Sequence, residues 1–304
     1  MPGEPVAVLL MAYGGPGSVE EVEPYLLDVR GGRPTSGELV AEVRQRYATI
    51  GGRSPILDHT RAQATALERT LGPDYRVYVG MRHWHPYIKD AVDRIVAAGT
   101  RRLVAIAMTP HYSSLSVGAY ETKLLEAAAG RLDLALVRNW GDHPKFLAAV
   151  RARVVQALQR FASPAAVRVI FTAHSLPRRI LAEGDPYPDE LLASARTVAE
   201  ALGLGEWHFA YQSAGASPEP WLGPDAGEAL ARLADEGVRD FLIVPIGFVC
   251  DHVEILYDID VQYRTLASEL GVRLERTASL NDDPLLIEAL ADIARRAAAE
   301  RRWA

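Results

Sequence analysis

Cysteine is almost missing from this chain of 304 residues, since Cys250 is its only one. A disulfide framework within the chain, or a metal site made of several thiolates, is therefore excluded. Long apolar runs are missing too: those at residues 6–13 and 241–249 are strand-length, far short of the ~20 residues that span a bilayer. The first residues, MPGEPV, have neither the basic start nor the apolar core of a signal peptide. We therefore expect a cytoplasmic protein without an integral membrane segment.

The chain also has fewer basic than acidic residues. The 33 lysines and arginines are outnumbered by 39 aspartates and glutamates, which gives a formal net charge of −6, and no basic block stands out. We therefore expect no nucleic-acid partner. Hydrophobic residues make up 49% of the chain and charged residues 24%, which is typical of a globular protein with one large domain or two ordinary ones.

Apolar runs of strand length alternate with longer segments of helical periodicity along the whole chain. This alternation predicts an α/β fold in which helices cover both faces of parallel sheets. The predicted strands are residues 6–13, 76–81, 103–108, 134–139, 167–173, 208–212, 241–247 and 272–276. Four fall in each half, so we predict two similar doubly wound domains, residues 1–145 and 146–304, each with a four-stranded parallel sheet.

The segments between the strands predict amphipathic helices. These are residues 36–50, 60–71, 88–98, 144–161, 190–202, 226–236, 254–270 and a last helix at 284–302. Whether that last helix packs back on the first domain is left open. Two strand ends resemble each other, MTPH up to His111 and FTAH up to His174, and each is followed by serine and a helical stretch.

The most informative stretch is residues 169–188, VIFTAHSLPRRILAEGDPYP. Apolar residues and threonine precede His174, as in a buried parallel strand. Pro177 cannot extend a strand ladder and biases Leu176 away from helix, so the strand should end near the histidine. The imidazole then lies at the carboxyl end of a strand, where open α/β sheets bind ligands. A histidine that only caps or packs a strand end would also fit this stretch taken alone.

A second chemically rich segment, FVCDHVEILYDID at residues 248–260, follows a predicted strand and opens a predicted helix. Glu254, Asp258 and Gln262 are spaced four residues apart, so they should lie along one helical face. Acids near a helix start can simply favour the helix dipole. A carboxylate that faces a neutral imidazole, however, can bind a divalent metal and accept protons.

These two segments, together with MAYGGP at residues 11–16 and YATIGGRSP at residues 47–55, resemble the signatures of the ferrochelatases. Those enzymes insert ferrous iron into a porphyrin and have a chelatase-like fold. The resemblance implies that His174 and Glu254 are catalytic, contact the metal, and face each other across the porphyrin. It also implies that Asp258 belongs to an outer metal site, although Gln262 stands where the family often carries an acid.

Further residues resemble the branch of the family that uses coproporphyrin III. In that branch a tyrosine at the position of Tyr13 ligates the iron of the product, and a phenolate is a known haem ligand. A tyrosine that closes the core with its hydroxyl in solvent would give the same sequence. Guanidinium and hydroxyl groups hold carboxylates, so the resemblance implies porphyrin contacts from Arg30, Arg46, Ser54 and Tyr120. The branch often has two basic residues where this chain has Arg30-Gly31.

The expected reaction converts Fe²⁺ and coproporphyrin III to coproheme and two protons, with His174 as base and Glu254 as the facing carboxylate. Three alternatives stay open: protoporphyrin IX as the substrate, insertion of cobalt or nickel into another tetrapyrrole, and haem binding without turnover. Fe²⁺ is a substrate here, and we expect neither a resident cofactor nor an iron–sulfur cluster, since no cysteine follows Cys250. We expect a monomer that makes transient contacts with neighbouring enzymes of haem synthesis.

Overall fold

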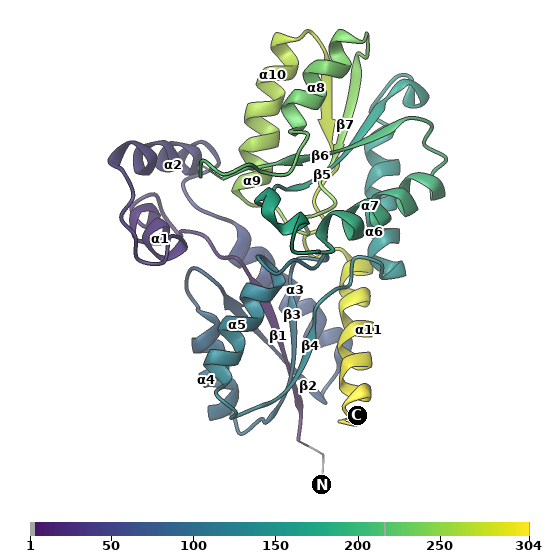
Figure 1. The fold of residues 1–304 in the computed structure, drawn as a ribbon. Coiled ribbons are helices and arrows are strands. Elements are labelled where there is room, and N and C mark those ends of the chain that lie inside the picture. Colours follow the sequence, from purple (N-terminus) through teal and green to yellow (C-terminus); the bar gives the residue numbers. More distant parts are fainter. Residues whose placement is uncertain (1–3, 216, 304) are drawn as a thin grey trace.

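The structure is a computed structural model that describes residues 4–215 and 217–303. These residues form two four-stranded parallel sheets, one in each half of the chain (Figure 1). The first sheet has the order β2-β1-β3-β4, made of Tyr75–Met81, Val6–Ala12, Arg102–Ala107 and Asp133–Val137. The second has the order β6-β5-β7-β8, made of Trp207–Gln212, Arg168–His174, Asp240–Val244 and Arg273–Arg276. All eight predicted strands are confirmed, with ends that differ by a few residues.

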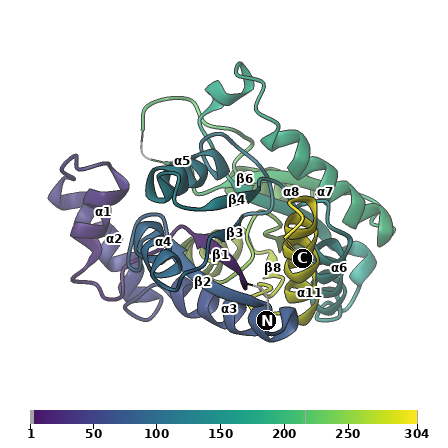
Figure 2. The same ribbon diagram turned by 90° about the horizontal axis from the view of Figure 1, so that it is seen from below.

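Helices cover both faces of each sheet, as predicted. In the first half, α3 and α11 cover one face of the sheet and α4 and α5 the other (Figure 2). In the second half, α6 and α7 lie on one face and α8 and α10 on the other. The bounds are α1 Val22–Val29, α2 Gly37–Thr49, α3 Ile56–Leu71, α4 Ile88–Ala97, α5 Val117–Ala128, α6 Pro144–Leu158, α7 Tyr187–Ala201, α8 Ala226–Asp235, α9 Val253–Leu256, α10 Arg264–Glu269 and α11 Pro284–Glu300. No helix in the described part of the chain has the length and apolar character needed to cross a membrane.

Strand β1 shows why the central strands are apolar throughout. Its side chains alternate between the two faces of the sheet, as the pleat requires. One set packs with α3 and α11, and the other packs with α4 and α5: these are Val6, Val8, Leu10 and Ala12, and then Ala7, Leu9 and Met11. All seven residues are buried, so the strand reads as an unbroken hydrophobic run.

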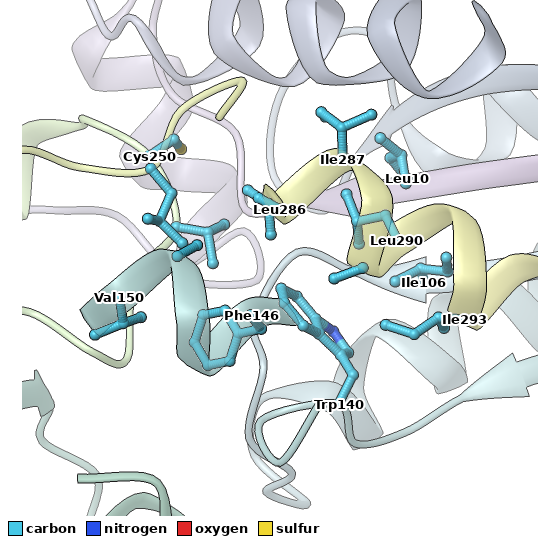
Figure 3. Close-up of a cluster of buried hydrophobic side chains, with 14 of the residues drawn as sticks. Leu10, Ile106, Trp140, Phe146, Val150, Cys250, Leu286, Ile287, Leu290 and Ile293 are labelled. Carbon is cyan, nitrogen blue, oxygen red and sulfur yellow. The ribbon is translucent and has the colours of Figure 1, made fainter. Parts of the chain in front are cut away.

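The last helix, α11, follows the second sheet in the chain but packs on the first. It contacts α3, β3 and β4 of the first half and also α6. Figure 3 shows Leu286 and Leu290 of α11 near Ile106 of β3 and Phe146 of α6. One hydrophobic core therefore runs from the first sheet to the second. A domain boundary near residue 145 stays a prediction.

The sequence suggests that His111 and His174 end equivalent strands. The order of the strands in the two sheets shows a different correspondence. β1 and β5 hold equivalent places in the two sheets, and so do β3 and β7. Tyr13, which follows β1, is therefore the counterpart of His174, which ends β5. His111 follows β3 and has its counterpart after β7. The two halves thus present Tyr13 and His174 from matching positions.

The single helix predicted over residues 254–270 is wrong, because a π-helix at Asp258–Tyr263 separates α9 from α10. The carbonyl of Tyr257 accepts hydrogen bonds from the amides four and five residues further on, both at 3.0 Å. The turn therefore holds one more residue than an α-helical turn, and side chains four apart no longer align. Asp258 is buried whereas Gln262 is exposed.

Candidate active site

A cavity of about 280 Å³ lies between the carboxyl ends of the two sheets. Residues that follow β1 and β3 line it from the first half, and residues that follow β5 and β7 line it from the second. This is the location that parallel sheets favour for ligands. The polar side chains of the lining include Tyr13, Ser54, Arg82, Tyr120, His174, Tyr187, Cys250, His252 and Glu254.

His174 and Glu254 meet in the wall of this cavity. His174 is the last residue of β5, as the position of Pro177 predicts, and Glu254 lies in α9 after β7. Nε2 of His174 is 3.5 Å from Oε1 of Glu254, and both residues come from the second half of the chain. This distance leaves no room for a macrocycle, so the prediction that the two residues face each other across the porphyrin is wrong. Nδ1 of His174 donates to the carbonyl oxygen of Ser175, which leaves Nε2 as the nitrogen that faces the carboxylate.

A second imidazole, that of His252, lies on the other oxygen of Glu254. Its Nε2 is 3.3 Å from Oε2, and its Nδ1 donates to the carbonyl of Cys250 at 2.9 Å. Glu254 is therefore held between two histidines. His252 was not predicted as a site residue, although it stands two residues before Glu254 in the motif.

The electrostatics of the pair keep both groups charged. Burial opposes the charge on Glu254, but His174 and His252 hold the pKa of that carboxyl far below its usual range. Burial likewise opposes the charge on His174, but Glu254 outweighs it and raises the pKa of the imidazole to about 9. Because a metal binds the neutral imidazole, His174 must lose a proton before it takes a metal ion.

Buried polar side chains fix the backbone on both sides of the pair. Gln212, at the end of β6, donates from Nε2 to the carbonyl of Glu254 at 2.7 Å, and its Oε1 accepts from Thr172 at 2.8 Å. The hydroxyl of Tyr187 donates to the carbonyl of His174 at 3.0 Å. Tyr187 lies in the GDPYP motif, but no contact was predicted for it from the sequence.

Asp185, in the same motif, ties the second half to a loop of the first. Its Oδ2 accepts from the hydroxyl of Ser113 at 3.0 Å and from the amide and the hydroxyl of Ser114, both at 2.8 Å. The next residues of that loop, Leu115 and Ser116, line the cavity. Asp185 therefore holds part of the cavity wall in place.

Tyr13 faces the cavity from the first half, with 38% of its surface exposed. The guanidinium of Arg82 lies 5.8 Å from the ring centre of Tyr13 and 5.6 Å from that of Tyr120. The ring of His83 packs on Tyr13 at 4.7 Å. Burial, and secondly the charge of Glu254, raise the pKa of Tyr13 to about 12, while Arg82 opposes the rise.

The residues predicted to hold the porphyrin divide into two groups. Tyr13, Ser54 and Tyr120 line the cavity, whereas Arg30 and Arg46 lie outside the lining. Ser54 is packed so closely against the glycine-rich turn that a Cβ on Gly15 would lie 2.5 Å from its hydroxyl oxygen. The role of each of these residues stays a prediction.

Arg46 and Asp258 lie close to each other, although they were predicted for different tasks. Nη1 of Arg46 is 3.9 Å from Oδ1 of Asp258, and the guanidinium lies 5.3 Å from the ring centre of Tyr257. The hydroxyl of Ser213 donates to Asp258. Burial raises the pKa of Asp258 to about 6, with Ser213 opposing the rise. Among the described residues no three His, Cys, Asp or Glu side chains are grouped to hold a metal, and the outer site stays a prediction.

Residues 5–298 match the family model described as Ferrochelatase. The chain belongs to the ferrochelatase family. It is therefore a metal chelatase that acts on a porphyrin. The ferrochelatase of Herpetosiphon aurantiacus is 47% identical over 295 residues, which cover 93% of this chain and 96% of that one. The coproporphyrin III ferrochelatase of Geobacillus thermodenitrificans is 39% identical over 300 residues, or 95% of this chain and 94% of that one.

Solved structures of other chelatases share the fold of this ferrochelatase. The sirohydrochlorin chelatase SirB from Bacillus subtilis, in complex with cobalt, matches with a TM-score of 0.61 at 12% identity over 98% of each chain. CbiX, the terminal enzyme of sirohaem biosynthesis in denitrifying bacteria, matches with a TM-score of 0.56 at 16% identity over 95% of this chain and 98% of that one. At such identities the likeness concerns the fold alone, and it agrees with the predicted chelatase-like architecture.

Proposed function

We propose that this ferrochelatase inserts ferrous iron into coproporphyrin III and forms coproheme. The observation that carries the proposal is one cavity with His174 and Glu254 on the side of the second sheet and Tyr13 on the side of the first. A macrocycle between the sheets would meet a base and a carboxylate from one half and a phenol from the other. Such an arrangement suits metal transfer because no closed set of ligands holds the ion.

The charges of the pair account for both protons of the reaction. In the resting enzyme His174 is protonated and Glu254 is charged. Fe²⁺ displaces the proton on Nε2, and this first proton leaves to solvent. When the ion moves to the ring nitrogens, His174 takes one pyrrole proton and Glu254 takes the other. Glu254 then releases the second proton to solvent, and the resting ion pair is restored.

Tyr13 and the arginines support a substrate with four propionates. Tyr13 would bind the iron of the product as phenolate, and Arg82 beside it stabilises negative charge on the ring oxygen. Nε of Arg30, of Arg46 and of Arg82 each lack a hydrogen-bond partner, so each of these arginines has an unused N–H that suits a propionate. One observation favours protoporphyrin IX, which has two propionates: Arg46 is already engaged by Asp258 and by Glu42 at 2.6 Å.

Anaerobic turnover of the purified protein with Fe²⁺ tests the proposal, with coproporphyrin III and protoporphyrin IX offered in parallel and followed by absorbance. We expect a clear preference for coproporphyrin III, and a Tyr13→Phe variant whose coproheme product has an altered absorption spectrum. His174→Ala should bind porphyrin but lose turnover. A preference for protoporphyrin IX overturns the substrate assignment. Full turnover by His174→Ala overturns the mechanism.

A further inference from the structure

The segment of residues 251–260 carries Glu254 on a short helix that does not continue as a regular α-helix. α9 spans four residues, and the π-helix begins two residues after it. A π-helical turn is rare and needs support from its surroundings. The position of Glu254 opposite His174 therefore depends on contacts from other elements. Gln212 holds the carbonyl of Glu254 itself, and further contacts lie at the ends of the segment.

Arg276, the last residue of β8, contacts both ends. Its Nε and Nη2 donate to the two carboxylate oxygens of Asp260 at 2.9 and 2.8 Å, the two-pronged geometry that suits arginine. Nη2 is also 3.2 Å from Oδ1 of Asp251. Only 12% of the Arg276 side chain is exposed. One guanidinium thus bridges the first and the last residue of the segment.

The loop after β8 strengthens the contact at the first end. Asp251 accepts from the hydroxyl of Ser279 at 2.8 Å and from Nδ2 of Asn281 at 3.1 Å. Oδ1 of Asn281 accepts in turn from the amide of Asp251 at 2.9 Å. The carbonyl of Asn281 accepts from Gln63 of α3 at 2.7 Å, so the same loop is also fixed to the first half of the chain.

We propose that Arg276 is a positioning residue that braces residues 251–260 and so holds Glu254 at the distance from His174 that metal binding requires. The side-chain partners of Arg276 in the described part of the chain are Asp251, Asp260 and the carbonyl of Thr277, and none of these lines the cavity. The effect of Arg276 passes through Asp251 and Asp260. The proposal rests on the proposed function, because it takes His174 and Glu254 as the metal-binding pair.

Arg276→Lys tests the brace, because lysine keeps the charge and loses the two-pronged contact. The readout is calorimetric binding of Co²⁺ to the porphyrin-free protein, with porphyrin affinity measured separately. Groups that orient metal ligands typically contribute about 10–100-fold to metal affinity, so we expect Co²⁺ affinity to fall by about tenfold or more with porphyrin affinity unchanged. Arg273→Lys is the matched control: Arg273 lies on the same strand and pairs with Glu275 at 3.1 Å, away from the segment. It should bind Co²⁺ like the unchanged protein.

Three further variants separate the possible outcomes. Asp260→Asn weakens the contact between Arg276 and Asp260 by changing the carboxylate, and it should also lower Co²⁺ affinity. This variant keeps the proposal testable if Arg276→Lys does not fold. Combined with Arg276→Lys it should add little, because both remove one interaction. Unchanged Co²⁺ affinity in both single variants overturns the brace alone, provided that His174→Ala weakens binding. Unchanged affinity in His174→Ala overturns the proposed metal pair, and the brace with it. A parallel loss of porphyrin affinity would mean general damage to the fold and would also overturn the brace.

Discussion

Replacing Glu254 by glutamine should remove the charge that keeps His174 protonated. At 3.5 Å, Coulomb's law with an effective dielectric constant of about 20 gives an attraction of about 5 kcal/mol. The rise in the pKa of His174 from 6.5 to about 9 corresponds to about 3 kcal/mol. This value is smaller because burial opposes the charge and because the two side chains are 32% and 29% exposed, so that solvent screens the attraction. Glutamine removes the attraction and leaves the burial, which is the largest influence on this group, opposed only by the carbonyl of Ser175 and the charge of Asp258, so the pKa of His174 should fall below 6.5.

An NMR titration of the histidine side chains measures this change directly. His174→Ala identifies the signal of His174 among the eight histidines of the chain. The unchanged protein should titrate at about 9 and Glu254→Gln below 6.5. Glu275→Gln is the matched control, since Glu275 pairs with Arg160 and Arg273 and no histidine. A His174 that titrates near 6.5 in the unchanged protein, or that keeps its pKa in Glu254→Gln, refutes the reasoning.

Three more predictions concern the same cavity. Because His174 is protonated below about 9, Zn²⁺ affinity should rise with pH up to that point, by about tenfold per pH unit, with one proton released per ion; calorimetry in two buffers checks this, and a pH-independent affinity contradicts it. Asp185→Ala deprives four donors of their charged acceptor and should lower the free energy of unfolding by about 3 kcal/mol in urea; a change below about 0.5 kcal/mol would show that these hydrogen bonds do not stabilise the loop. In Gly247→Ala the new Cβ would lie 2.6 Å from the Cβ of Ala173, beside His174, and should cost about 1–3 kcal/mol and much of the turnover. Gly205→Ala, with open space around it, is its control in thermal unfolding.

The residues that terminate strands could be interpreted from the sequence because their effect is local. Pro177 stops β5 at His174 through its own backbone geometry, wherever the rest of the chain lies. The unbroken apolar run of β1 likewise reports burial on both faces. Pro177 was enough to place the imidazole at a strand end, and the alternation of strand-length and helical segments was enough to predict the parallel sheets. Helix α1 was missed because Pro24 interrupts its pattern, although proline is tolerated in a first helical turn.

Features that depend on distant partners could not be predicted in this way. The π-helix contains Asp260, whose partner Arg276 lies 16 residues further along the chain. Arg46 was assigned to the substrate because arginines hold carboxylates, but the structure also offers it a carboxylate of the protein, Asp258. Neither contact leaves a periodic signal in the sequence. The spacing of four between Glu254 and Asp258 was therefore interpreted as an ordinary helical face.

The late position of α11 in the chain has a consequence for synthesis. The ribosome makes the whole first sheet before the second, but α11, which covers one face of the first sheet, emerges only after both. Until then, the part of that face that α3 does not cover has to remain open or bind something else, such as a chaperone. The first half of the chain therefore cannot complete its core as an independent unit during translation. Its final folding has to wait for the last helix, and the nascent chain exposes apolar surface for most of its synthesis.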